Sequence, residues 1–220
     1  MTFADRNLAL QQPLKGNTME NVKVTGLSPA YSVAALNQTL AGKAALAMAA
    51  SLFVALCAHL VVPLPFTPVP LTLGDFAVLL VGLMLGPVTG FAALTLYLAE
   101  GAAGMPVFSP TGPGGIAQLI GTTGGYLMAY PIAAAVAGGL SRTVSRMRSG
   151  SMTAFASAIT ANAAAGAIIM IFGVLWLAFV LHLAPALAFK LGALPFLPGQ
   201  AIKVLAAAGI ATSIHRLRKS

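Results

Sequence analysis

Residues 63–73, PLPFTPVPLTL, and residues 105–125, MPVFSPTGPGGIAQLIGTTGG, are crowded with proline and glycine, although the sequence around them is strongly apolar. Irregular backbone of this kind does not face lipid, because unpaired N–H and C=O groups are too costly there. The two stretches are therefore expected either to cap a bundle of membrane helices or to line a cavity inside it. They are the first candidates for a ligand-binding region.

The composition indicates an integral membrane protein. Of the 220 residues, 58% are hydrophobic and 7% are charged, whereas soluble domains carry about 25% charged residues. The formal net charge of +8 raises the possibility of a nucleic-acid partner, but the basic residues cluster at the chain ends and in one short loop rather than along an exposed face. We interpret them as topology signals and expect no nucleic-acid binding.

The apolar runs predict about six membrane-spanning helices, since a helix needs roughly 17 to 25 apolar residues to cross. We expect an all-α integral membrane protein with one transmembrane domain at residues 42–220, preceded by a mostly flexible cytoplasmic tail at residues 1–41. The expected spans are 42–62, 72–85, 88–103, 124–140, 152–183 and 198–214.

The positive-inside rule tests this arrangement. With both termini in the cytoplasm, the basic residues near the predicted inner ends of the spans all fall on the cytoplasmic side. They are Lys43 at the start of the first span, Arg142, Arg146 and Arg148 in the loop between the fourth and fifth spans, and Arg216, Arg218 and Lys219 after the sixth. The segments 63–71, 104–123 and 184–197 then lie outside, with Lys190 as their only basic residue. We expect the three segments to share one outer mouth.

A mouth built from aromatic and apolar loops with few charges suits a compact, partly apolar small molecule. Polar side chains near the helix ends would orient that molecule. The candidate substrate-binding residues are Phe66, Tyr97, Glu100, Phe108, Gln118, Tyr126, Asn162, Gln200 and Lys203.

The charged candidates have structural alternatives. Lys203 lies about one turn inside the last span, where it would either meet a ligand carboxylate or act as an ordinary interfacial lysine. Glu100 would accept hydrogen bonds from a ligand amide or urea, or pair with Lys203 as a structural bridge. Asp75 is interpreted as an acid that stabilises a helix N-terminus.

The uncharged candidates have alternatives too. Tyr97 and Tyr126 would also suit the aromatic belt at a membrane interface, and Asn162 would also suit a hydrogen bond between helices. His59 and His182 lack the spacing of metal ligands. With no nucleophile and base, metal cluster or phosphate-binding loop in the sequence, we predict neither enzyme activity nor a metal or cofactor.

Small residues mark one stripe of the first span. Ala41, Ala45 and Ala49 recur at every fourth position, so they would allow the close approach of another helix. That helix would belong either to a partner protein or, as is more frequent, to the same bundle.

Four motifs in the chain resemble the BioY family, the biotin-capturing S components of energy-coupling factor (ECF) vitamin transporters. They are PFTPVPLT at 65–72, YLAEGAAGMPVF at 97–108, TTGGYL at 122–127 and PFLPGQAIK at 195–203. The resemblance implies a six-helix S-component bundle that holds biotin under the outer loops. It also implies high-affinity biotin uptake across the bacterial cytoplasmic (inner) membrane.

The resemblance implies partners and residue roles as well. The partners are a membrane-embedded coupling subunit, contacted by the alanine stripe of the first span, and two ATPase subunits that hydrolyse ATP. The family's last motif reads Pro-Gly-Asp with a lysine three residues after the acid, and both side chains help to bind biotin. The lysine matches Lys203, but Gln200 holds the acid position, and Gly74-Asp75 stands where the family usually has Gln-Thr.

Two other functions stay open at this stage. One is a stand-alone carrier for biotin or a related vitamin that works without the ATPase subunits. The other is a membrane scaffold that binds no small ligand, although the gathering of polar groups at one mouth argues against it.

Overall fold

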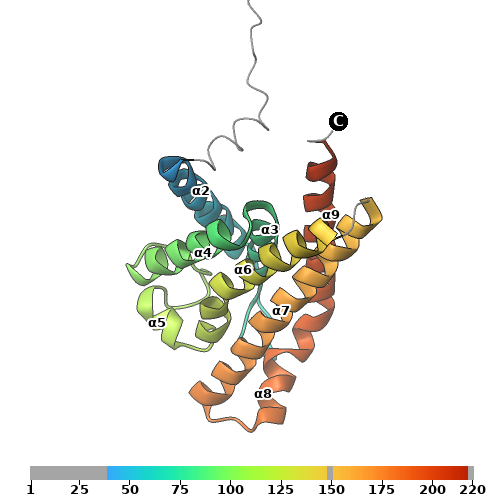
Figure 1. Cartoon of the computed structure of the whole chain (residues 1–220). Helices are drawn as coiled ribbons and strands as arrows, with labels where there is room; N and C mark the ends of the chain where they lie inside the picture. The colour runs from blue at the N-terminus through green and yellow to red at the C-terminus, as the bar shows by residue number, and fades with distance from the viewer. Residues whose placement is uncertain (1–38, 148–150, 218–220) are drawn as a thin grey trace, which may run out of the picture.

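The computed structural model describes residues 39–147 and 151–217, and most of the predicted tail lies outside the described residues. The described chain is almost entirely helical (Figure 1). In chain order its elements are α2 (Leu40–Ala58), β1 (Val61–Val62), β2 (Leu71–Thr72), α3 (Gly74–Leu85), α4 (Pro87–Ala102), α5 (Gly115–Ile120), α6 (Gly124–Met147), α7 (Ser151–Leu181), α8 (Pro185–Gly192), a 3-10 turn η1 (Leu194–Phe196) and α9 (Leu197–Leu217).

The predicted spans coincide with the six longest described helices, α2, α3, α4, α6, α7 and α9. The short helices α5 and α8 were not predicted, and each lies within a proposed outer segment. They lie toward the end of the molecule opposite the start of α2 and the end of α9 (Figure 1). The strands β1 and β2 pair antiparallel, with Val61 opposite Thr72, so the loop between them turns back on itself.

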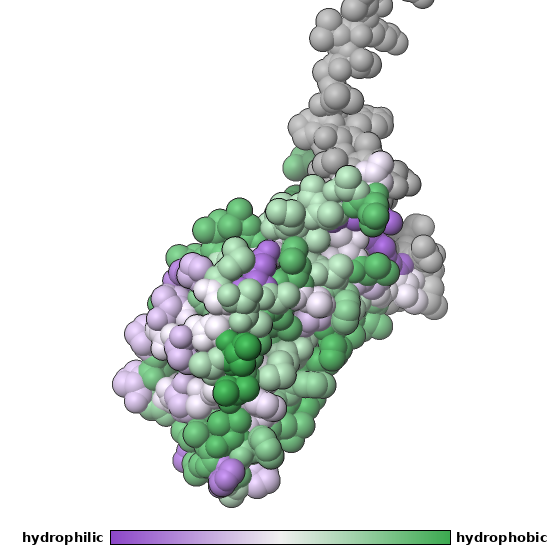
Figure 2. Space-filling model, turned by 90° about the vertical axis from the view of Figure 1, so that its left-hand side faces the viewer, coloured by the Kyte–Doolittle hydropathy of each residue, from purple (hydrophilic) through white to green (hydrophobic). Residues whose placement is uncertain are grey.

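The surface supports a multi-pass membrane protein. Three described segments are long and apolar enough to cross a membrane, namely Leu40–Ala58, Met152–Leu181 and Pro185–Ile214, and α3 is a shorter apolar helix. Large apolar side chains cover the outside of the bundle, and the face drawn in Figure 2 is mostly hydrophobic. Such a surface belongs in lipid, while the number of six crossings stays a prediction.

The core lies between the long helices and is built largely from alanine. Ala77 of α3, Ala93 of α4, Ala134 of α6, Ala165 of α7 and Ala207 of α9 are all fully buried. Small residues let helix backbones approach closely, which is how membrane helices gain packing energy without a hydrophobic effect between them.

Glycines allow a close approach of α3 to α6. A Cβ atom added to Gly82 would lie 2.5 Å from the carbonyl oxygen of Ala134, and one added to Gly138 would lie 2.5 Å from the carbonyl oxygen of Gly82. Only glycine fits at these two positions without moving the backbone. Gly82 lies near the C-terminal end of α3, so this contact fixes the helix against α6 at that end. The candidate site lies at the first turn of α3, at the opposite end of the helix.

At this same end α3 stops at Gly86, whose φ of 81° lies in the region that favours glycine. Pro87 then starts α4, as proline does at a first helical position. The guanidinium of Arg142, from α6, covers this turn, and its Nη2 donates to the carbonyl oxygen of Leu85 at 3.0 Å. A basic side chain that we predicted to mark the cytoplasmic side thus also caps α3.

Candidate ligand-binding site

A cavity lies beneath the β1–β2 loop, among the helix ends next to the Pro/Gly-rich segments. It contains about 540 Å³ of space, including the part open to solvent. Its wall combines apolar and aromatic side chains with hydroxyl, amide and carboxylate groups. The lining residues are Ala58, Val69, Pro70, Leu71, Thr72, Asp75, Tyr97, Ser109, Gln118, Thr123, Tyr126, Leu127, Tyr130, Met170 and Phe196.

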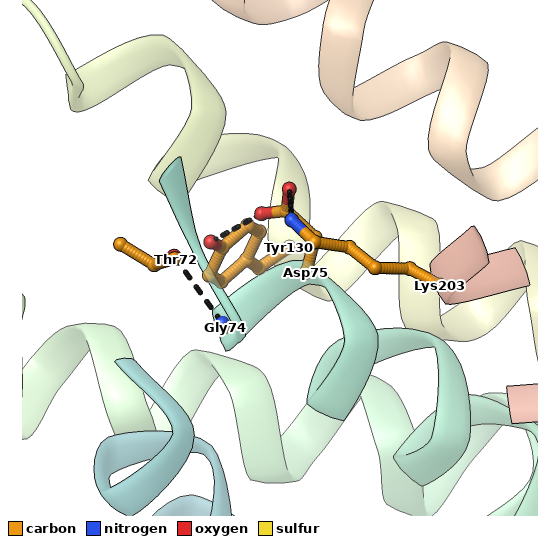
Figure 3. Close-up of polar contacts among 5 residues, drawn as sticks. All are labelled: Thr72, Gly74, Asp75, Tyr130 and Lys203. Atoms are coloured by element: carbon orange, nitrogen blue, oxygen red, sulfur yellow. Dashed lines mark hydrogen bonds and ion pairs between the residues drawn. The ribbon is translucent and has the colours of Figure 1, made fainter. Parts of the chain in front are cut away.

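An ion pair stands at the wall of this cavity. Lys203 Nζ, from α9, lies 3.1 Å from Asp75 Oδ2, from the first turn of α3, and the two side chains are 7% and 14% exposed. Figure 3 shows the lysine side chain reaching to the carboxylate. A lysine this deep in a membrane helix needs a partner, and here the partner is an acid of the same chain.

The carboxylate of Asp75 has a second partner. The Tyr130 hydroxyl, from α6, donates to Asp75 Oδ1 at 2.8 Å (Figure 3). Gly74 leaves room for this approach, because a Cβ atom there would lie 3.1 Å from the Tyr130 hydroxyl oxygen, which is a tight contact. Thr72 Oγ1 accepts from the Gly74 N–H at 3.2 Å, which fixes the start of α3. Three helices therefore meet at one carboxylate.

The positions of the two acids correct the sequence interpretation. Asp75 does lie in the first turn of its helix, as predicted, but its main role as the partner of Lys203 was missed. The alternative that Glu100 pairs with Lys203 is wrong. Glu100 instead accepts a short hydrogen bond from Ser51 of α2, and it stands outside the residues that line the cavity.

The two candidate tyrosines line the cavity and are buried, so the alternative of an exposed interfacial belt is wrong for both. The Tyr97 hydroxyl donates to the carbonyl oxygen of Val107 at 3.1 Å, and the Tyr126 hydroxyl donates to that of Gly192 at 2.7 Å. Each tyrosine thus ties an outer segment to the helices below it. Phe108 packs edge-on against Tyr97, with ring centroids 5.4 Å apart, and supports the cavity wall from behind.

Gln118 of α5 separates this inner cavity from a second one nearer the surface. Its Oε1 accepts from the Gly114 N–H at 3.1 Å, and its Nε2 donates to the carbonyl oxygen of Ser109 at 3.5 Å. The outer cavity contains about 380 Å³ of space, including the part open to solvent. Both cavities are lined by Pro70, Gln118 and Thr123, so they are neighbouring parts of one mouth.

Other predicted site residues lie apart from the cavity wall. Phe66 is 61% exposed on the β1–β2 loop. Asn162 and Gln200 are buried where α7 faces α9, and Asn162 Nδ2 donates to the carbonyl oxygen of Val204 at 3.5 Å. Within the described residues, the Gln200 amide has no hydrogen-bond partner. A binding role for these residues stays a prediction.

Several lining residues were not predicted as part of the site, above all Asp75 and Tyr130. Asp75 had a signal, since it is an acid next to a Pro/Gly-rich stretch in an otherwise uncharged region. Tyr130 had no such signal in the sequence, because whether its side chain faces the mouth depends on the rotation of α6 about its own axis. Among the described residues, no group of three or more His, Cys, Asp or Glu side chains is placed to hold a metal ion.

Comparison with known sequences gives a consistent result. The sequence model of the BioY family matches residues 27–220. The probable biotin transporter BioY of Pyrococcus horikoshii is 38% identical over 148 residues, which are 67% of this chain and 82% of the relative. The biotin transporter BioY of Thermotoga maritima is 35% identical over 156 residues, which are 71% and 86% of the two chains.

Comparison with solved structures finds the same kind of fold. The crystal structure of the S component for biotin from an ECF-type ABC transporter matches with a TM-score of 0.68 at 24% sequence identity. The match covers 81% of this chain and 91% of the other. At this level of identity the likeness shows a common helical architecture.

Proposed function

The chain belongs to the BioY family, and from this premise we propose that it binds biotin in the inner cavity and serves as the substrate-capture subunit of an ECF-type transporter. It is a membrane transport protein and not an enzyme. The relatives named as biotin transporters support the ligand, and the fold of the biotin S component supports the architecture.

The observation that carries the proposal is the composition of the cavity wall. Biotin combines an apolar bicycle and chain with a cyclic urea at one end and a carboxylate at the other. The cavity offers apolar and aromatic side chains, such as Leu127, Met170 and Phe196, together with the carboxylate of Asp75. A mostly apolar site with a few fixed polar groups is what selective binding of such a molecule needs.

The alanine stripe of α2 supports the proposed partner contact. Ala41, Ala45 and Ala49 are all exposed on the described molecule, so the stripe is free to receive a helix of another protein. We assign it to the membrane-embedded coupling subunit, and two ATPase subunits bound to that subunit would supply the energy. On this proposal the chain needs no cofactor or metal of its own.

The proposed setting is the bacterial cytoplasmic membrane, with both termini in the cytoplasm and the cavity open to the outside. The start of α2 and the end of α9 lie toward the same end of the molecule (Figure 1). Lys43 near the start of α2 and Arg142 near the end of α6 would then lie on the cytoplasmic side, as the positive-inside rule favours.

Equilibrium binding of labelled biotin to the purified full-length protein tests the ligand, with riboflavin and thiamine as competitors. The proposal predicts saturable binding near one biotin per chain that neither competitor displaces. Unselective or absent binding by well-folded protein would show that the chain keeps the family's fold but has another ligand or none. Uptake that persists after deletion of the ATPase genes would assign the chain to stand-alone carriers instead.

A further inference from the structure

We propose that Asp75 is the residue that selects the ligand, by accepting hydrogen bonds from the cyclic urea of biotin, so that the ligand carboxylate points outward. This inference rests on the proposed biotin binding and deepens it. It assigns Asp75 a role that differs from stabilising a helix end, and it gives Lys203 a positioning role behind the acid rather than a direct contact with the ligand carboxylate.

The first reason is which member of the ion pair faces the cavity. Asp75 is among the residues that line it, whereas Lys203 is not. The lysine is also the more buried of the two, with 7% of its side chain exposed against 14% for Asp75. A ligand that enters the cavity therefore meets the carboxylate before it meets the ammonium.

The second reason is that Asp75 keeps free accepting positions. Its Oδ1 accepts from Tyr130 and its Oδ2 from Lys203, but each carboxylate oxygen has two lone-pair sites. The ion pair and the tyrosine thus fix the orientation of the carboxylate without using its full capacity. Holding an acceptor in place before the ligand arrives lowers the entropy cost of binding.

The third reason is that the surrounding hydroxyl groups are also acceptors. Tyr97, Tyr126 and Tyr130 donate their hydroxyl protons to Val107, Gly192 and Asp75 respectively. Their oxygens can still accept a hydrogen bond. The inner end of the cavity is therefore rich in acceptors, which matches the two N–H donors of a cyclic urea and opposes a carboxylate, since a carboxylate has acceptors only.

The ligand carboxylate then needs a place farther out. The outer cavity is lined by the hydroxyl-bearing residues Thr111, Thr122 and Thr123, and it shares Pro70, Gln118 and Thr123 with the inner one. There the carboxylate would stay partly hydrated and away from Asp75, where like charges would repel. The valeryl chain of biotin would pass between Pro70 and Gln118, which belong to both cavities.

Ligand analogues test this orientation on the unaltered protein. Biotin methyl ester lacks the charged carboxylate, and 2-iminobiotin carries a cationic guanidinium in place of the urea. With the head at Asp75, we expect the ester to bind within about threefold of biotin, and iminobiotin to bind as tightly as biotin or more tightly, because charged hydrogen bonds to a carboxylate are strong. The contrary result has two parts: the ester binds to the parent protein more than about tenfold more weakly than biotin, and the two ligands bind equally to Lys203→Met. This result would place the ligand carboxylate at Lys203 and overturn the inference.

The Asp75→Asn variant provides the second arm. It should weaken binding of iminobiotin by about tenfold more than binding of biotin, since it removes the charge that faces the head group. Because the variant leaves Lys203 without its counter-ion, the double variant Asp75→Asn/Lys203→Met is measured beside it and should show the same loss of preference for iminobiotin. Unchanged preference in both folded variants would overturn the inference, whereas failure of the parent protein to bind biotin at all would overturn the proposed function.

Discussion

The described part of the chain contains two acidic residues, and they lie in contrasting regions of the molecule. Asp75 joins α3 to α6 and α9 at the wall of the cavity, where Tyr130 and Lys203 hold both of its oxygens. Glu100 joins α4 to α2 outside the cavity lining, where its described partner is the neutral hydroxyl of Ser51. In sequence the two look alike, since each is a lone acid among apolar residues.

The two acids differ in their partners, and this difference is the basis for the roles that we propose for them. A carboxylate with a lysine and a tyrosine from two other helices is fixed in place and compensated in charge, and it keeps accepting positions toward a cavity. A carboxylate with one serine links two helices, and it lines neither of the two cavities described above. We therefore assign ligand recognition to the first region and helix contact to the second.

The largest expected effect comes from removing the lysine of the cavity region. Lys203→Met leaves the Asp75 carboxylate buried without its cation, and breaking a buried pair from one side costs about 3 kcal/mol or more. Thermal unfolding of the unliganded protein in detergent should show this loss. The matched double variant Asp75→Asn/Lys203→Met should recover most of the stability, because it removes both charges. Equal unfolding temperatures for the single and double variants would show that Lys203 does not stabilise the protein by neutralising Asp75.

The next effect comes from moving α3 against α6. Gly82→Ala forces a Cβ atom to within 2.5 Å of the Ala134 carbonyl oxygen, and overpacking of this kind costs about 1–3 kcal/mol. The control is Gly139→Ala on α6, whose Cβ would meet only the Pro87 Cβ atom, at 3.9 Å. Gly82→Ala should unfold at a lower temperature than Gly139→Ala. Equal unfolding temperatures would show that α3 and α6 are packed more loosely than described.

A smaller effect is expected from one hydroxyl group. Tyr130→Phe removes the bond to Asp75 Oδ1, and loss of a hydrogen bond to a charged group should weaken biotin binding by roughly tenfold. Tyr126→Phe removes a hydroxyl that bonds to Gly192 instead, so it should weaken binding less. If titrations show that the two variants lose the same biotin affinity, the hydrogen bond from Tyr130 that orients Asp75 makes no special contribution to binding.

The smallest effect is expected in the other region. Glu100→Gln keeps an oxygen that can accept from Ser51, so it should cost less than about 1 kcal/mol of stability. Since Glu100 stands outside the cavity lining, biotin affinity should stay within about twofold of the parent value. A clear loss of affinity would return Glu100 to the binding site and remove the contrast between the two acids.

The apolar runs were sufficient to predict the long helices α2, α3, α4, α6, α7 and α9, because the length and hydrophobicity of a membrane helix are local properties of the sequence. The pairing of Asp75 with Lys203 was not predictable, since 128 residues separate them and only the packing of α3 on α9 brings them together. Asn162 and Gln200 show the same limit. Their helices are apolar on most sides, so the pattern does not show that these residues face each other's helix and not the cavity.

The short helices α5 and α8 were missed for a different reason. Both lie in Pro/Gly-rich outer segments whose composition indicates loops, and they have 6 and 8 residues, too few to show a periodic apolar pattern. The segment that contains α5 still contributes Gln118 to the cavity, as the sequence suggested. The sequence thus predicted the kinds of side chain that gather near the cavity better than it predicted where each of them lies.

The most direct test compares the two acids in one experiment, by titrating biotin into the parent protein, Asp75→Asn and Glu100→Gln, each purified and checked for folding in the same detergent. We predict that the parent and Glu100→Gln bind biotin within about twofold of each other and that Asp75→Asn binds about tenfold or more weakly. Equal affinities for the two variants, or a greater loss in Glu100→Gln, would contradict the assignment of ligand recognition to the region around Asp75.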